Sequence, residues 1–126
     1  MKEFRLVPFV NCELEQAIDL RVETDWSVDE SELMIQFVVV GAIDRLKIPP
    51  ASDVPQRTTG LWETTCFECF LGSLGQENYW EMNLSPSGDW NVFRLDGYRE
   101  NLREEPMIKT LPFSVTRCSD RMTVEA

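Results

Sequence analysis

The residues best suited to binding chemistry fall in one run, residues 62–99, where aromatic, acidic and amide side chains alternate with apolar ones. The candidate ligand-binding residues are Trp62, Glu68, Glu81, Asn83, Trp90 and Arg94. An indole ring stacks on the apolar C–H face of a sugar, while carboxylates, amides and a guanidinium bind its hydroxyl groups. The same residue types also build a solvated sheet face with cross-strand pairs. By residue types alone, that plain face is the commoner explanation.

Catalytic chemistry has little support in this sequence. There is no histidine, so the usual general base is absent and no Ser-His-Asp or Cys-His arrangement exists within the chain. A glycosidase needs two carboxylates at a defined separation. Glu63, Glu68 and Glu81 are available, but nothing singles out a pair. We therefore predict that the chain is not an enzyme, with a glycosidase as the alternative in that class.

The cysteines do not form a recognisable metal or redox motif. They are Cys12, Cys66, Cys69 and Cys118. Cys66 and Cys69 match the C-x-x-C pattern, but they lie in a strand-like run, where residues three apart point to opposite faces. We predict free thiols, no metal and no cofactor. Haem binding needs an axial ligand, and without histidine only Met34, Met82 or a cysteine is left for that role, each more simply a core residue.

The charge balance limits the classes of partner. Twelve Lys and Arg stand against 22 Asp and Glu, a formal net charge of −10. Such a chain repels phosphate backbones and anionic lipids, so we expect neither nucleic acid nor a membrane as a partner. Neutral sugars and cations remain open. The N-terminus lacks the apolar core of a signal peptide, and the longest apolar stretch, residues 37–43, is too short to span a membrane, so we expect a cytoplasmic protein.

Short alternating segments predict the elements that position these side chains. We expect strands over residues 4–10, the end of 14–22, 33–41, 61–72, 78–84, 90–95, 113–118 and 122–125. Residues 25–32, 85–88 and 96–97 are predicted turns, 47–60 a long loop, and 99–105 a short helical turn; 42–46 extend a strand beyond a bend at Gly41. Together they predict a single all-β domain over residues 1–126, an antiparallel two-sheet β-sandwich.

Strand alternation also predicts which side chains share a face. Apolar sets in residues 67–71, 80–84 and 91–95 are expected to form one wall of the core. Glu68, Glu81, Asn83 and Arg94 then lie on a common outer surface, with Trp90 and Asp96 beside them. Arg94 is expected to be balanced there by carboxylates.

Three ordered motifs in this region resemble a known family. Residues 60–68 are similar to the G-L-W-x-x-T-C-F-E run of bacterial DOMON-like domains, residues 81–90 to their E-x-N-x-S-P-S-G-x-W run, and residues 96–99 to their D-x-Y-R run. The resemblance implies a β-sandwich related to family-9 carbohydrate-binding modules, a wider group whose members bind sugars or haem. It therefore favours a non-catalytic domain that binds a carbohydrate on one sheet face, with haem binding as an alternative.

The resemblance also bears on the end of the chain. Members of the family are expected to continue with further strands, whereas this sequence stops at residue 126. The prediction is a domain without its C-terminal strands, whose exposed sheet edge invites a homodimer or another protein. A protein-interaction or structural domain is thus the third functional alternative.

Overall fold

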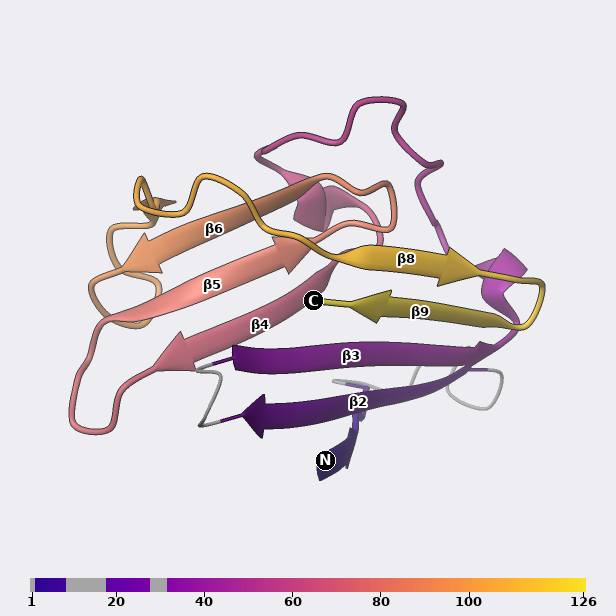
Figure 1. Cartoon of the computed structure of the whole chain (residues 1–126), viewed down its shortest axis with the longest axis horizontal. Coiled ribbons are helices and arrows are strands. Elements are labelled where there is room, and N and C mark those ends of the chain that lie inside the picture. The colour runs from indigo at the N-terminus through magenta and orange to yellow at the C-terminus, as the bar shows by residue number, and fades with distance from the viewer. Residues whose placement is uncertain (1, 9–17, 28–31) are drawn as a thin grey trace. The chain divides into compact units, whose positions relative to one another are not determined.

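The fold consists of strands joined by turns and loops (Figure 1). The structure, a computed structural model, describes residues 2–8, 18–27 and 32–126. These residues form two antiparallel sheets in two compact units, one made of Met1–Lys47 with Pro112–Ala126 and the other of Ile48–Leu111. The predicted all-β class with two antiparallel sheets is therefore confirmed. Within the described ranges, no helix has the length and apolar character needed to cross a membrane.

The first unit contains a five-stranded sheet in the order β1-β2-β3-β9-β8. Its strands are β1 (Lys2–Arg5), β2 (Ile18–Ser27), β3 (Glu32–Gly41), β8 (Ser114–Arg117) and β9 (Arg121–Glu125). A short 3-10 turn, η1 (Ile43–Arg45), follows β3. β2 and β3 pair along all ten residues of each strand, which fixes their register over a long hairpin.

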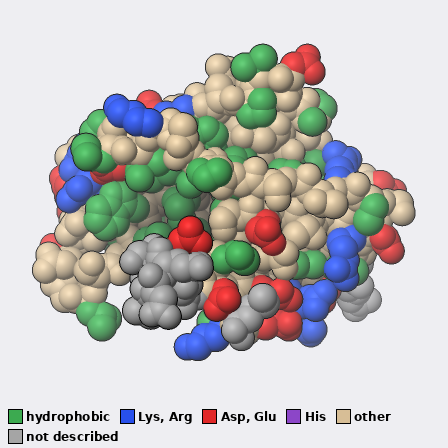
Figure 2. All heavy atoms as spheres, viewed as in Figure 1, with side chains coloured by type: hydrophobic (Ala, Val, Ile, Leu, Met, Phe, Trp, Pro, Cys, Tyr) green, Lys and Arg blue, Asp and Glu red, His purple; other side chains and the backbone are tan. Residues whose placement is uncertain are grey.

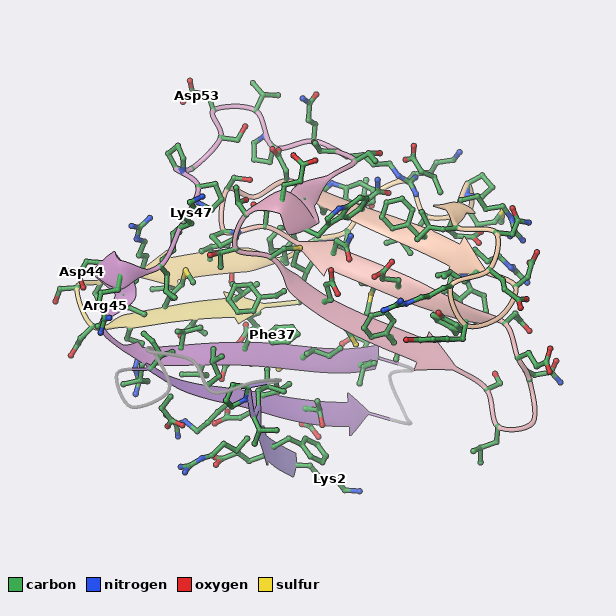
Figure 3. The ribbon with its side chains drawn as sticks, turned by 180° about the vertical axis from the view of Figure 1, so that it is seen from behind. Lys2, Phe37, Asp44, Arg45, Lys47 and Asp53 are labelled. Carbon is green, nitrogen blue, oxygen red and sulfur yellow. The ribbon has the colours of Figure 1, made fainter. Side chains whose placement is uncertain are left out.

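β3 is the central strand of this sheet and is covered on both sides. Phe37, which Figure 3 labels on β3, lies opposite Val124 of β9, and Val39 lies opposite Met122. All four side chains are buried, and so is Val38, which points to the other face. Both faces of β3 are therefore covered towards its end, whereas Met34, on the same face as Val38 near its start, is 47% exposed.

Several predicted boundaries in this unit were wrong. The first strand begins at residue 2 and ends at residue 5, before Pro8, while residues 9–10 lie outside the described part. Residues 25–27, predicted as a turn, continue β2, because backbone pairing with β3 carries the strand through polar positions. Residues 42–46 form η1 and not a strand extension. The predictions for residues 14–17 and 28–31, and Cys12, lie outside the described residues.

The predicted sheet edge does not coincide with the last strand. β9 lies inside its sheet, between β3 and β8, and Ala126 still exchanges backbone hydrogen bonds with Ile35 of β3. The outer strands of this sheet are β1 and β8. β9 therefore has no free edge for a partner to pair with.

The second unit contains a four-stranded sheet in the order β4-β5-β6-β7. Its strands are β4 (Phe67–Gly72), β5 (Tyr79–Leu84), β6 (Trp90–Leu95) and β7 (Arg103–Glu104). The predicted turn at residues 85–88 is confirmed: the Gly88 N–H donates to the Ser85 carbonyl at 3.0 Å, and Gly88 has a φ of +97°. Figure 2 shows hydrophobic side chains gathered at the left of the view, over the strands of this sheet.

Two segments of this unit differ from prediction. Residues 61–63, predicted as the start of a strand, form a 3-10 turn, η2 (Leu61–Glu63), after Gly60 at a φ of +85°. Residues 99–105 are not helical, because Arg99 and Asn101 have positive φ values and residues 103–104 pair with β6 as β7. A positive φ at a non-glycine residue breaks a right-handed helix.

Candidate functional site

The strands β4, β5 and β6 bring polar side chains into rows across one face of their sheet. In one row Glu68 lies directly opposite Asn83, which lies directly opposite Asn91. In the next row Glu81 lies opposite Phe93. Directly opposed residues point to the same side of a sheet, so these five share a face, which we name the Asn83 face. The prediction that Glu68, Glu81 and Asn83 share a side of the sheet is confirmed. The predicted outer surface is wrong for Asn83, which is 0% exposed.

The two amides of this face are equally buried but differently bonded. Asn83 and Asn91 are both 0% exposed. Asn91 Oδ1 accepts hydrogen bonds from Arg57 Nε and the Val92 N–H, each at 2.8 Å, and its Nδ2 donates to the Thr58 carbonyl at 3.1 Å. Neither Oδ1 nor Nδ2 of Asn83 has a hydrogen-bond partner among the described residues. A buried unpaired amide costs about 1–3 kcal/mol, so Asn83 does not stabilise the fold.

Two carboxylates stand beside the unpaired amide. Burial raises the pKa of Glu68 above its ordinary value. Burial and the negative charge of Glu68 together raise the pKa of Glu81. Each carboxylate thus experiences a partly desolvated environment in which a second negative charge is close by. An arrangement of this kind favours a ligand that donates hydrogen bonds or brings positive charge.

An exposed indole ring lies at the edge of the same face. Trp62 belongs to η2, which contacts β5, and Figure 3, seen from behind Figure 1, shows η2 in front of this sheet. The ring centroid of Trp62 is 6.1 Å from that of Phe93, with a tilt of 59° between the planes. Phe93 lies directly opposite Glu81, so the indole contacts a direct neighbour of Glu81. The Trp62 side chain is 50% exposed and keeps ring surface available for stacking.

Arg94, by contrast, lies on the opposite face of the sheet, so its predicted place beside Glu81 was wrong. It is directly opposite Trp80, and its guanidinium carbon lies 5.1 Å from the Trp80 ring centroid. Arg94 Nη1 is 3.7 Å from Glu105 Oε2, and the Trp80 indole N–H donates to the same oxygen at 3.2 Å. The predicted balance of Arg94 by a carboxylate holds, but the carboxylate is the buried Glu105.

Glu105 is held as an anion by these contacts. Burial acts to raise the pKa of Glu105, but hydrogen bonds from the Met107 N–H and the Trp80 indole, with the nearby Arg94, bring the pKa below its ordinary value. The carboxylate is 5% exposed and joins β5 and β6 to the segment after β7. We therefore assign this cluster to the support of the sheet.

Trp90 is also on the opposite face, directly opposite Leu84, and its ring is not available for stacking. It is 8% exposed, and the guanidinium carbon of Arg57 lies 5.1 Å from its ring centroid. Arg57 also donates to the carbonyls of Ile108 and Val92, at 2.8 Å each, and so anchors the long loop to β6. Trp90 thus belongs to the support of the site. Asp96, predicted beside it, is exposed in the turn after β6 and is paired with Arg103 at 2.9 Å.

Of the two cysteines in the C-x-x-C run, Cys69 lies in β4, whereas Cys66 precedes the first residue of the strand. Cys69 lies opposite Met82, on the face away from Asn83. Burial raises the pKa of the Cys66 thiol to about 12, with further contributions from the charges of Glu68 and Glu81. Both thiols are free and far from reactive. No group of three or more Cys, Asp or Glu in the described ranges is placed to hold a metal ion.

The first unit carries two open surface hollows. One, of about 430 Å³, lies between η1 and the β8–β9 turn and is lined by Ile43, Asp44, Arg117, Cys118 and Ser119; Figure 3 labels Asp44 on η1. The other, of about 530 Å³, lies beside the start of β3 and the end of β9. Neither is lined by a buried polar group that lacks a partner among the described residues. We therefore place the candidate site on the Asn83 face.

Sequence reasoning missed three contributors to this region. Asn91 and Phe93 had been assigned to the core wall, because β6 is apolar on both faces and gives no face signal. Arg57 lies in the long loop, where no local sequence pattern predicts a contact with β6.

Comparison of the chain with family models, with curated proteins and with solved structures finds no match.

Proposed function

We propose that this chain is a non-catalytic, cytoplasmic DOMON-like domain that binds a carbohydrate on the Asn83 face. The observation that carries the proposal is the buried amide of Asn83, which has no partner among the described residues and stands beside two carboxylates. A sugar hydroxyl is both a donor and an acceptor, so it matches the Nδ2 and Oδ1 of one amide together with a carboxylate. Because Asn83 is 0% exposed, the proposal requires that the side chains covering the amide move aside when the sugar binds. Selection tolerates an unpaired buried amide where binding gains from it.

The Trp62 indole supplies the second half of a sugar site. Pyranose rings present a flat face of C–H groups, which an indole covers while the hydroxyl groups at the ring edge are hydrogen-bonded. Trp62 is half exposed and contacts Phe93, a direct neighbour of Glu81. A polar floor with an aromatic edge suits a neutral or donor-rich saccharide better than an anionic ligand, since Glu68 and Glu81 repel negative charge.

The test is calorimetric titration of the intact chain with β-1,4-linked tetramers of glucose, xylose and N-acetylglucosamine, and with muropeptides. We expect at least one to bind, and Trp62→Ala to weaken that binding by about tenfold or more. Tyr98→Ala is the matched control, because Tyr98 is an exposed aromatic in the same unit but lies on the turn after β6. Failure of every saccharide at millimolar concentration, or equal losses in the two variants, would overturn the proposal.

Haem binding and a protein-interaction role remain predictions that no observation favours over this one. A haem titration monitored at the Soret band accompanies the saccharide panel. We expect no shifted Soret band, because the chain has no histidine to ligate the iron.

A further inference from the structure

The acidic pair on the Asn83 face has no basic side chain to balance it. All twelve Lys and Arg of the chain lie in the described residues, and none forms an ion pair with Glu68 or Glu81. Three other carboxylates of the same unit, Glu104, Glu105 and Asp96, each pair with an arginine. Further carboxylates of the unit, such as Glu63 and Glu77, also have no ion pair among the described residues, but Glu68 and Glu81 are the two that adjoin the unpaired amide.

The Asn83 face also carries more hydrogen-bond acceptors than donors. When ionised, Glu68 and Glu81 can only accept hydrogen bonds. Asn83 adds one acceptor atom, Oδ1, and the two donor hydrogens of Nδ2. A ligand that fits must therefore donate more hydrogen bonds than it accepts. A hydroxyl group donates one, whereas an ammonium group donates three and brings a positive charge.

The aromatic edge agrees with a cationic ligand. The face of an indole attracts ammonium groups, most strongly where water is partly excluded. Trp62 contacts Phe93, which lies directly opposite Glu81, so the ring and Glu81 share a neighbour on the same side of the sheet. A bare divalent cation is a poorer match, because calcium takes six to eight oxygen ligands and this face offers two carboxylates and one amide oxygen.

We propose that the saccharide bound on the Asn83 face is an amino sugar with a free, protonated amino group, which binds between Glu68 and Glu81 with the sugar ring against Trp62. This inference rests on the proposed carbohydrate-binding function and names the class of sugar. Acetylation of the amine removes its charge and two of its donors, so the acetylated sugar is the matched ligand that the site discriminates against.

The test compares three β-1,4-linked tetramers of equal length, made of glucosamine, N-acetylglucosamine and glucose, in calorimetric titrations of the intact chain. We expect the glucosamine tetramer to bind about tenfold tighter than either of the others, with the difference shrinking as salt rises. Glu81→Gln should remove this preference while leaving binding that depends on Trp62. Glu77→Gln, the same change of charge in the β4–β5 turn, should leave the preference intact.

The outcomes separate the two proposals. Equal or tighter binding of the glucose tetramer overturns the amino-sugar inference and leaves carbohydrate binding standing. Failure of all three tetramers, and of the wider panel, removes carbohydrate binding itself. The chain is also titrated with calcium chloride alone. Binding heat that is seen with the wild type and lost in Glu81→Gln would overturn the inference of an ammonium ligand and indicate a metal ion instead.

Discussion

Replacement of the two buried amides by leucine, one at a time, gives a matched pair of variants with opposite expected effects. Asn83 and Asn91 are directly opposed on neighbouring strands, have the same side chain and are equally inaccessible to solvent. They differ only in bonding, because Asn91 has three hydrogen bonds and Asn83 has none among the described residues. Leucine has the same branching at Cγ as asparagine and carries no polar group, but it is larger, so any overpacking cost falls on both variants.

The structure sets the size of each effect. Asn83→Leu removes an unpaired buried amide, so we expect the free energy of unfolding to rise by about 1–2 kcal/mol. Asn91→Leu leaves the Thr58 carbonyl and the Val92 N–H without their side-chain partner and removes one of the two acceptors near Arg57 Nε, the other being Glu104 Oε2 at 2.6 Å, so we expect a loss of about 2–4 kcal/mol. The variants should therefore differ by about 3–6 kcal/mol although the substitution is the same.

Urea unfolding, followed by fluorescence and circular dichroism, measures both values through the midpoint and slope of each transition. Asn83→Leu should also lose saccharide binding, because the proposed site uses this amide. A loss of stability in Asn83→Leu as large as that in Asn91→Leu would refute the reasoning, because overpacking acts at both positions and only the lost hydrogen bonds should separate them.

Two further predictions concern charged groups. Arg57→Lys should lower the free energy of unfolding by about 1–3 kcal/mol, because one ammonium cannot reach Asn91, Val92 and Ile108 together; Arg103→Lys, at an exposed pair, should cost less than about 1 kcal/mol in the same urea assay. The raised pKa of Glu81 means that the folded state binds its proton more tightly than the unfolded state, so this group's contribution to stability falls as pH rises through the folded-state pKa. Glu81→Gln should therefore stabilise the protein more at pH 7 than at pH 4, whereas Glu105→Gln, whose pKa is lowered, should remove stability that the wild type has at pH 7 and loses in acid. Equal effects of Glu81→Gln at the two pH values would contradict the raised pKa.

Local chemistry was enough to predict much of the second sheet. Residues 90–95 lie between two predicted turns and form β6 with the predicted bounds. The turn before β6 follows from Pro86, which presets φ, and Gly88, which takes a positive φ. In the same way, the alternation of β4 correctly placed Glu68 and Cys69 on opposite faces.

The composition of the site was harder, because it depends on the register between strands. β6 carries buried side chains on both faces, Val92 on one and Phe93 on the other, so its apolar pattern does not say which set faces Asn83. A shift of one residue exchanges the two sets. This is why Trp90 and Arg94 were predicted on the wrong face, and why Asn91 was missed.

The supporting contacts could not be predicted, because they join segments far apart in the chain. Arg57 lies in the long loop and binds carbonyls of β6 and of the segment after β7. Trp62 reaches the Asn83 face because residues 61–63 leave the extended conformation, although the apolar run there favoured a strand. Tertiary contacts decided both cases against local propensity.

The most direct test of carbohydrate binding on the Asn83 face is a nuclear magnetic resonance titration of ¹⁵N-labelled protein with the glucosamine and glucose tetramers. We expect the resonances of the Asn83 side-chain amide and the Trp62 indole N–H to shift together on addition of saccharide. The side-chain amide of Asn91 and the indole N–H of Trp80, which are already bonded within the fold, should shift little. Unchanged Asn83 and Trp62 resonances at a saturating saccharide concentration would contradict the account.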